Sequence, residues 1–281
     1  MTALLEARDL RKAYAVGDTV VRAVDGLSFK LPAGGSLGLV GESGSGKTTT
    51  ARMLVGLEAP DSGEILVAGR PLHGGGRGRS QRLARAKAVQ IVFQDPYLSL
   101  DPRVSVADCI DAVLRLHTEL GRTDRARRTA ELLGQVGLGA REAAAYPRRL
   151  SGGQRQRAAI ARAMAVEPQV LVLDEAVSAL DVSVQAQVLN LLADIRHETG
   201  VGLVFVSHDL AVVRYVCDEI VVMHHGRAVE QGATAQLLAD PQHPYTRLLL
   251  ASVPRPGWDL DEISRRRQEV GASAAGRAGG S

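Results

Sequence analysis

The segment GESGSGKTT, residues 41–49, has the residue types and spacing that suit phosphate binding. It fits the pattern GxxxxGK[ST], in which glycines let the backbone wrap a phosphate with successive N–H groups pointing inward. Lys47 can reach the β- and γ-phosphates of a nucleotide, and the Thr48 hydroxyl can bind Mg²⁺. The candidate nucleotide ligands in this loop are Gly41, Glu42, Ser43, Gly44, Ser45, Gly46, Lys47, Thr48 and Thr49.

Two carboxylates follow an apolar run in the segment VLVLDE, residues 170–175. Open parallel sheets bind their ligands at the carboxyl ends of the strands, so a buried strand ending in acids fits such a site. Asp174 would hold Mg²⁺ through its water shell, and Glu175 would polarise the attacking water. Taken alone this signal is weak, but together with Lys47 it predicts nucleotide hydrolysis.

A second candidate phosphate site lies in LSGGQRQR, residues 150–157. A serine and two glycines precede a run with a helical pattern, which leaves free N–H groups at a helix start. The chain therefore carries two candidate phosphate sites far apart in the sequence.

The elements that must position these residues alternate between strands and helices. Short apolar runs predict buried strands at residues 35–40, 89–93, 170–173, 202–206 and 220–223. A helix is predicted from Val184 onward, where the apolar residues Val184, Val188, Leu191, Leu192 and Ile195 share one face, and Gly200 can end it. This alternation predicts an α/β core with a largely parallel sheet.

Other regions depart from that alternation. Residues 4–31 and 64–72 favour antiparallel strands, with turns at Asp25-Gly26 and Ala68-Gly69. Residues 101–164 are nearly all helical in pattern, and residues 73–80 are typical of a solvated loop. From about residue 255 to residue 281 the composition predicts a disordered tail.

Composition narrows the functional class. The chain has 281 residues, 45% hydrophobic and 23% charged, as in an ordinary globular protein, and its net charge of +3 is too small to indicate a nucleic-acid partner. The arginine-rich stretch 77–85 lacks interleaved aromatic residues, which favours a solvated face over nucleic-acid binding.

Cys109 and Cys217 have no CxxC spacing, which predicts buried thiols in a reducing compartment. We expect a cytosolic protein, because no apolar run approaches the roughly 18 residues of a membrane span.

With the phosphate loop, LSGGQRQR and LVLDE in this order, the chain resembles the nucleotide-binding domain of an ATP-binding cassette protein over about residues 4–252. The resemblance implies a P-loop NTPase core with a mainly parallel sheet, an antiparallel β subdomain and an α-helical signature subdomain. Residues 1–252 would form the ATPase domain, with the helical subdomain at about 101–164. ATP and Mg²⁺ are the implied ligands.

The resemblance assigns further roles. Tyr14 would stack on adenine, and Gln94 would contact Mg²⁺ or the water and sense a transmembrane partner. His208 would touch the γ-phosphate, and Asp181, in the SALD loop 178–181, would cross between two subunits. Without the resemblance, Tyr14 would be interpreted as a packing residue and Gln94 as a surface loop residue. His208 would be a structural histidine, and Asp181 would be a helix cap.

In such proteins LSGGQ serves the nucleotide of the opposite subunit, which answers why one chain has two phosphate sites. Two domains would pack head to tail, and Ser151 and Gly153 would contact the γ-phosphate held by the partner, at a helix beginning near Gln154. Gly152 and Gln154 are further implied nucleotide-binding residues of this segment. One departure is Ala176, where the family usually has proline. We expect a slightly looser turn there and an active enzyme.

Two stretches indicate a subfamily. QDPYLSLDPR, residues 94–103, and DPQHPYTRLLLASVP, residues 240–254, resemble the ATPases of peptide importers and of related nickel and opine importers. The second stretch resembles their C-terminal docking segment. The chain lacks the cysteine-bearing extension common in peptide importers, so we expect no iron–sulfur cluster.

The resemblance implies two transmembrane permeases, a second cassette ATPase (identical or homologous), and an extracytoplasmic binding protein acting indirectly, with this chain at the cytoplasmic face of the membrane. Nickel or opine import remains an alternative to di- or oligopeptide import. A soluble cassette ATPase of DNA repair or translation is disfavoured, since those carry long coiled-coil insertions or tandem cassettes. A non-catalytic subunit is disfavoured by Glu175, Gln94 and His208.

Overall fold

The computed structural model describes residues 3–73 and 78–252. The strands are β1 (Ala3–Val16), β2 (Thr19–Pro32), β3 (Ser36–Val40), β4 (Ser62–Val67), β5 (Arg70–Pro71), β6 (Val89–Val92), β7 (Val170–Asp174), β8 (Gly202–Ser207), β9 (Glu219–His224) and β10 (Arg227–Ala233). The helices are α1 (Lys47–Leu54), α2 (Arg79–Ala88), α3 (Val106–His117), α4 (Arg122–Gln135), α5 (Ala140–Ala144), α6 (Gly152–Met164), α7 (Val182–Thr199), α8 (Leu210–Val216), α9 (Thr234–Ala239) and α10 (Pro244–Ala251), with short 3-10 helices at Pro96–Leu98 and Pro147–Arg149.

A six-stranded sheet in the order β10-β9-β3-β8-β7-β6 forms the centre of the molecule. Its strands are parallel except β10, which pairs antiparallel with β9. The predicted α/β core with a largely parallel sheet is confirmed, and all five apolar runs form strands of this sheet. Because parallel strands end at one edge, the segments that follow β3, β6, β7 and β8 lie along the same edge of the sheet.

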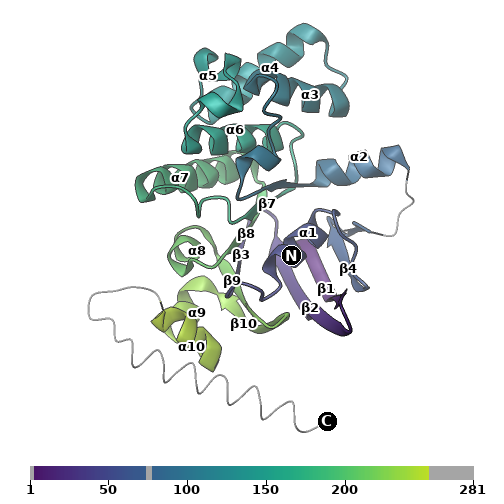
Figure 1. Cartoon of the computed structure of the whole chain (residues 1–281), viewed down its shortest axis with the longest axis vertical. Coiled ribbons are helices and arrows are strands. Elements are labelled where there is room, and N and C mark those ends of the chain that lie inside the picture. Colours follow the sequence, from purple (N-terminus) through teal and green to yellow (C-terminus); the bar gives the residue numbers. More distant parts are fainter. Residues whose placement is uncertain (1–2, 74–77, 253–281) are drawn as a thin grey trace.

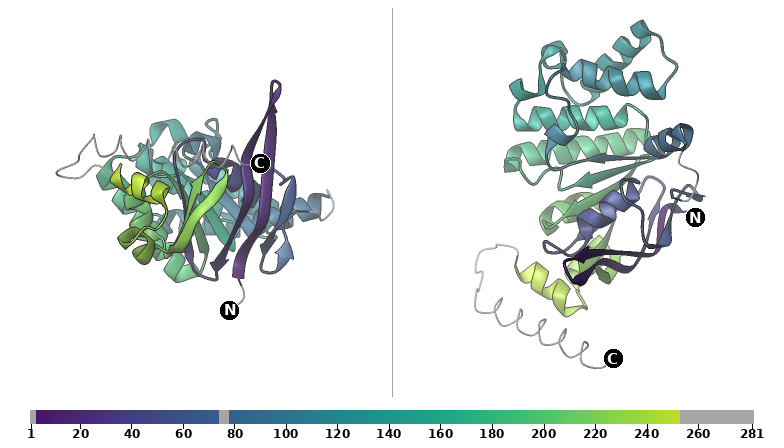
Figure 2. Two further views of the ribbon diagram at one scale, coloured as in Figure 1. Left: turned by 90° about the horizontal axis from the view of Figure 1, so that it is seen from below. Right: turned by 45° about the vertical axis from the view of Figure 1, so that its right-hand side comes forward.

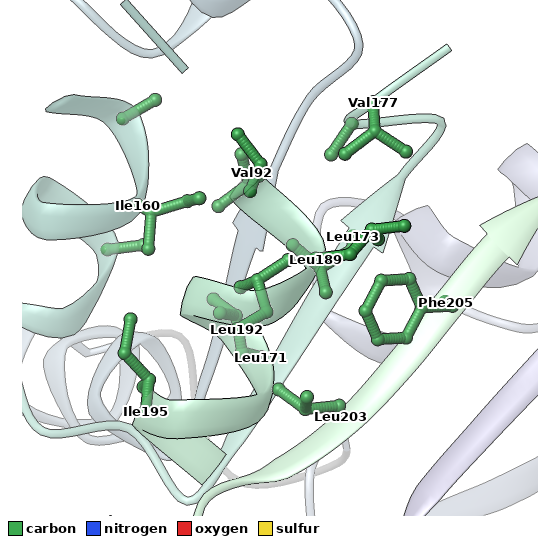
Figure 3. Close-up of a cluster of buried hydrophobic side chains, with 14 of the residues drawn as sticks. Val92, Ile160, Leu171, Leu173, Val177, Leu189, Leu192, Ile195, Leu203 and Phe205 are labelled. Atoms are coloured by element: carbon green, nitrogen blue, oxygen red, sulfur yellow. The ribbon is translucent and has the colours of Figure 1, made fainter. Parts of the chain in front are cut away.

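The two faces of this sheet are covered by different layers. Successive residues of a strand point to opposite faces. Leu171, Leu173, Leu203 and Phe205 pack with the helices α6 and α7 (Figure 3). Their neighbours, including Val172 and Val204, pack instead with α1 and the antiparallel sheet. Burial on both faces explains why these strands have continuous apolar runs.

The antiparallel sheet has the order β2-β1-β4-β5. Figure 2 shows β1 and β2 as a long hairpin beside the central sheet. The turn predicted at Ala68-Gly69 joins β4 to β5, and both residues have positive φ, 47° and 74°, as a type I′ hairpin turn requires.

The turn predicted at Asp25-Gly26 is wrong. The hairpin turns instead at residues 17–18, between the paired residues Val16 and Thr19, and residues 25–26 lie inside β2. Gly26 is a bulge with a φ of 79°, since Asp25 pairs with Arg11 and the next pair is Leu27 with Leu10. The strand continues because its pairing with β1 resumes after the bulge, and the Asp25 side chain is ion-paired there to Arg11 and Arg227, both at 2.6 Å.

The segment predicted to be helical carries α3, α4, α5 and α6, which gather at one end of the molecule (Figure 1). The solvated loop predicted at residues 73–80 is partly wrong, because Arg79 begins α2, and residues 74–77 lie outside the described residues. The predicted tail 255–281 also lies outside them. Cys109 and Cys217 are free and buried, as predicted.

Candidate nucleotide-binding and hydrolysis site

The phosphate loop joins the carboxyl end of β3 to the first residue of α1, the predicted strand–loop–helix context. Two of its glycines are required by close packing. A Cβ at Gly41 would lie 2.2 Å from the carbonyl oxygen of Met223, and a Cβ at Gly46 would lie 2.1 Å from that of Ala23. Gly46 has a φ of 102° and stands at the N-cap position of α1. The absence of a Cβ at these two positions therefore lets the loop pack closely where it turns into the helix.

Lys47 lies inside this loop and is only 5% exposed. Its ammonium donates hydrogen bonds to the carbonyl oxygens of Gly41 at 2.8 Å and Glu42 at 2.7 Å. Burial lowers the pKa of Lys47, while the nearby carboxylates of Glu175 and Asp174 raise it. The loop thus holds a cation beside two carboxylates at the edge of the sheet.

Asp174 ends β7 and is 8% exposed. Burial and the charge of Glu175 raise its pKa, whereas the charges of Arg52 and Lys47 and a hydrogen bond with the Thr48 side chain lower it. Within the described residues, the Asp174 Oδ1 atom is buried without a hydrogen-bond partner. An unpartnered carboxylate oxygen next to a hydroxyl suits a hard cation such as Mg²⁺, which prefers oxygen ligands.

Glu175 follows Asp174 and turns the chain away from the sheet with a φ of 49°. Its N–H donates to the Val206 carbonyl at 2.9 Å, and its Oε1 lies 3.3 Å from Nδ1 of His208. The turn, which contains Ala176, is closed by the N–H and hydroxyl of Ser178, which donate to the Glu175 carbonyl at 3.1 and 2.9 Å.

Gln94 reaches the same site from the segment after β6. Its Nε2 atom donates to the Ser178 Oγ at 3.2 Å. Ser178 therefore connects Gln94 to the turn that carries Glu175. Sequence reasoning included Ser178 in the SALD loop but gave it no individual role, and the only signal was its place in that loop.

Tyr14, on β1, lies beside the first turn of α1. Its hydroxyl donates to Glu58 at 2.5 Å and also hydrogen bonds with the Thr49 side chain. Burial and the Glu58 carboxylate raise the pKa of Tyr14. The structure thus places this aromatic ring next to the phosphate loop.

The second candidate phosphate site forms the start of α6. The helix begins at Gly152, two residues before the predicted start, because Ser151 caps it. The Ser151 hydroxyl accepts from the Gln154 N–H at 3.2 Å, and the Gln154 side chain accepts from the Ser151 N–H at 3.0 Å. A Cβ at Gly153 would lie 2.4 Å from Val184 on α7, so this glycine lets the two helices pack closely.

Asp181 stands at the N-cap position of α7 without a side-chain capping hydrogen bond. Among the described residues, no hydrogen bond or ion pair links Asp181 or residues 151–154 to the phosphate loop at 41–49. The structure therefore brings the phosphate loop, Asp174, Glu175, His208 and Gln94 to one edge of the sheet and leaves the signature segment outside that cluster.

A lysine-bearing phosphate loop and two carboxylates at the carboxyl edge of a parallel sheet are the parts of a nucleotide hydrolase. The sequence matches the family described as ABC transporter over residues 24–178 and the family described as oligopeptide/dipeptide transporter, C-terminal region, over residues 229–279. The chain belongs to the ABC transporter family of ATPases. It binds ATP, as members of this family do, and the resemblance stated from the sequence is confirmed.

Two transport ATP-binding proteins are similar in sequence to this chain over most of its length. It is 46% identical over 260 residues to the di/tripeptide transport ATP-binding protein DppF of Pseudomonas aeruginosa, covering 90% of this chain and 80% of that protein. It is 45% identical over 272 residues to the oligopeptide transport ATP-binding protein OppF of Bacillus subtilis, covering 96% and 88%.

Solved cassette structures share the fold. A dimeric ATP-binding cassette in a post-hydrolysis state, bound to ADP and Pi, superposes with a TM-score of 0.74 at 26% identity, covering 82% of this chain and 98% of that one. A cassette of the cbiONQ transporter complex of Clostridium perfringens superposes with a TM-score of 0.75 at 28% identity, covering 85% and 91%. Within residues 3–73 and 78–252, no helix has both the length and the apolar character needed to cross a bilayer.

Proposed function

We propose that this chain is the ATP-hydrolysing subunit of an importer for di- or oligopeptides. The single observation that carries the substrate class is the match of residues 229–279 to the C-terminal region of oligopeptide and dipeptide transporters. The relatives named for peptide transport support it, because their similarity extends over at least 90% of this chain. The clustered loop and carboxylates support the hydrolytic role.

The residues gathered at the edge of the sheet would have different roles in phosphoryl transfer. Catalysis of this reaction consists largely of positioning and charge neutralisation. Lys47 and the N–H groups of the loop bind the β- and γ-phosphates, and Tyr14 stacks on the adenine. Glu175 would orient the attacking water and accept its proton. Its contact with His208 at 3.3 Å supports a joint role of the two side chains at the γ-phosphate.

Mg²⁺ fits the donor set formed by Asp174 and Thr48. The unpartnered, buried oxygen of Asp174 and the Thr48 hydroxyl would hold the ion, directly or through water, with Gln94 completing the set. The ion would neutralise charge on the β- and γ-phosphates. Gln94 would then report the state of this site to the membrane-spanning partner.

The signature segment acts on a second subunit. Ser151 and Gly153 would bind the γ-phosphate held by the opposite cassette, supported by the positive end of α6. Asp181 would lie at the junction of the two cassettes. ATP then stabilises the closed dimer because it binds both surfaces, and hydrolysis removes that stabilisation.

The assembly that follows contains two permeases, a second cassette subunit, and an extracytoplasmic binding protein that delivers the substrate. The chain would work at the cytoplasmic face of the membrane, held there by the permeases. The segment 240–254 would contribute to docking.

A tagged pull-down tests this assembly. The Glu175→Gln variant, solubilised from membranes with Mg-ATP, should trap the closed dimer and retain two permeases and a second cassette. The matched variant Lys47→Ala should weaken ATP binding and lose the closed dimer. Recovery of Glu175→Gln as a soluble homodimer with no membrane protein would refute the importer assignment.

A further inference from the structure

The C-terminal helix α10 places one tyrosine against the phosphate loop. Tyr245 is 1% exposed, and its hydroxyl accepts a hydrogen bond of 2.9 Å from the backbone N–H of Glu42. The two residues are 203 positions apart in the sequence. Tyr245 belongs to the HPYT stretch, to which the roles described above assign no part in nucleotide binding.

Local contacts fix the tyrosine in this position. Pro244 begins α10, and the His243 Nδ1 atom accepts from the Tyr245 N–H at 3.1 Å, capping the helix. The Tyr245 ring stacks on the His224 ring with centroids 3.9 Å apart and an interplanar angle of 24°. His224 ends β9, and the preceding carbonyl, that of Met223, closely approaches Gly41. The end of β9, the start of the phosphate loop and α10 therefore form one packed unit.

The hydrogen bond reaches Lys47 through a single peptide group. The N–H of Glu42 and the carbonyl of Gly41 belong to the same planar peptide. That carbonyl accepts from the Lys47 ammonium at 2.8 Å, while the N–H donates to Tyr245 at 2.9 Å. Fixing one end of a planar group fixes the other, and hydrogen bonds in series polarise one another in a buried site.

We propose that Tyr245 is a positioning residue for ATP binding, which holds the peptide between Gly41 and Glu42 and so orients Lys47 toward the phosphates. This inference rests on the phosphate-binding role proposed for Lys47. It gives the C-terminal segment a part in the nucleotide site besides docking. Because coupling between two sites is reciprocal, bound ATP must also stabilise α10 in its contact with the loop.

The variant Tyr245→Phe separates the hydroxyl from the packing of the ring. Phenylalanine keeps the stack on His224 and removes the acceptor of the Glu42 N–H. We expect the KM for ATP of the assembled transporter, and the Kd of the full-length chain for Mg-ATP, to rise about 3- to 10-fold, as for the loss of one hydrogen bond. The kcat at saturating ATP should stay within about twofold, because bound phosphate holds Lys47 once it is in place.

Tyr215→Phe is the matched control. Its hydroxyl donates to Asn190 at 2.6 Å on the exposed side of α8, away from the loop, so the variant should bind ATP like the wild type. An unchanged KM and Kd for Tyr245→Phe would overturn the positioning role. If the wild type and the control also failed to bind ATP, the proposed function would fail as well.

A measurement on the wild type does not depend on the folding of a variant. Amide hydrogen exchange of peptides spanning residues 244–251 should slow at least about threefold when Mg-ATP is added, because the loop and α10 stabilise each other. Peptides from the exposed helix α2 serve as an internal reference and should not change. Equal exchange of residues 244–251 with and without Mg-ATP would overturn the coupling.

Discussion

The Asp174 carboxylate lies in an environment that opposes its charge. It is buried beside Glu175, and its Oδ1 has no partner among the described residues. Burial of this charge, which the nearby cations Arg52 and Lys47 offset only in part, lowers the stability of the folded state. The same arrangement leaves an oxygen available for the proposed Mg²⁺, so in the proposed site stability would be given up for cation binding.

The variant Asp174→Asn should raise the stability of the protein and lower its hydrolytic activity. It removes the charge and keeps an oxygen that can accept from Thr48. We expect the nucleotide-free protein to be more stable by about 1 to 3 kcal/mol, with a higher Tm in thermal unfolding, while Mg-dependent hydrolysis falls at least about 100-fold. Asp194→Asn, on the exposed side of α7, is the control. A lower Tm for Asp174→Asn than for the control would contradict this explanation.

At the scale of elements, Gly152 and Gly153 at the start of α6 differ in how closely they pack against neighbouring side chains. A Cβ at Gly153 would lie 2.4 Å from Val184, whereas a Cβ at Gly152 would lie 3.4 Å from Leu180, an ordinary contact distance. Gly153 therefore sets how closely α6 approaches α7, before any nucleotide is bound.

The pair Gly153→Ala and Gly152→Ala tests this division. Overpacking at residue 153 should lower the free energy of unfolding by about 1 to 3 kcal/mol, while residue 152 should change it by less. Chemical denaturation of the nucleotide-free protein measures both. Equal stabilities of the two variants would show that α7 does not restrict residue 153.

The packing of α10 on β9 should weaken in acid. Burial, followed by the charges of His225 and His243, lowers the pKa of His224 to about 4, below the value of about 6.5 in an unfolded chain. As pH falls from about 6.5 toward 4, the unfolded chain takes up a proton that the folded chain does not, so stability present above pH 6.5 is lost.

The variant His224→Phe keeps an aromatic ring against Tyr245 and cannot titrate. Its Tm should therefore fall less than that of the wild type between about pH 7 and about pH 5. Thermal unfolding across this range measures the difference. Parallel Tm curves for the two proteins would exclude His224 as a source of the acid sensitivity.

At the scale of the whole molecule, the sequence predicted what depends on local pattern. The phosphate loop, the strand ending in Asp174 and Glu175, and the parallel core all follow from short runs of residue types. The contact between Tyr245 and Glu42 joins residues 203 positions apart and has no local signal beyond the HPYT stretch itself. The hairpin turn was misplaced because Asp-Gly is a strong turn signal, whereas β2 continues its pairing with β1 through a bulge at Gly26. Asp25 is ion-paired there to Arg11 on β1 and Arg227 on β10.

The arrangement of the whole chain is also consistent with the proposed use of its two candidate phosphate sites. The loop and its carboxylates gather at the sheet edge, and the start of α6 remains outside that cluster and is capped by its own Ser151 and Gln154. Among the described residues, this helix start has no hydrogen bond or ion pair to its own phosphate loop, which suits the proposed contact with the nucleotide of a second cassette. The proposed import function would require both cassettes and the permeases.

Peptide uptake by the complete transporter tests the central claim most directly. Cells expressing the permeases, the binding protein and both cassettes should accumulate a labelled dipeptide with the wild-type chain. With Glu175→Gln they should accumulate at least about 100-fold less per unit time, as for the loss of a general base. Uptake that is equal with the wild type and Glu175→Gln, or that is absent with both while ATP is hydrolysed, would contradict the proposed peptide importer.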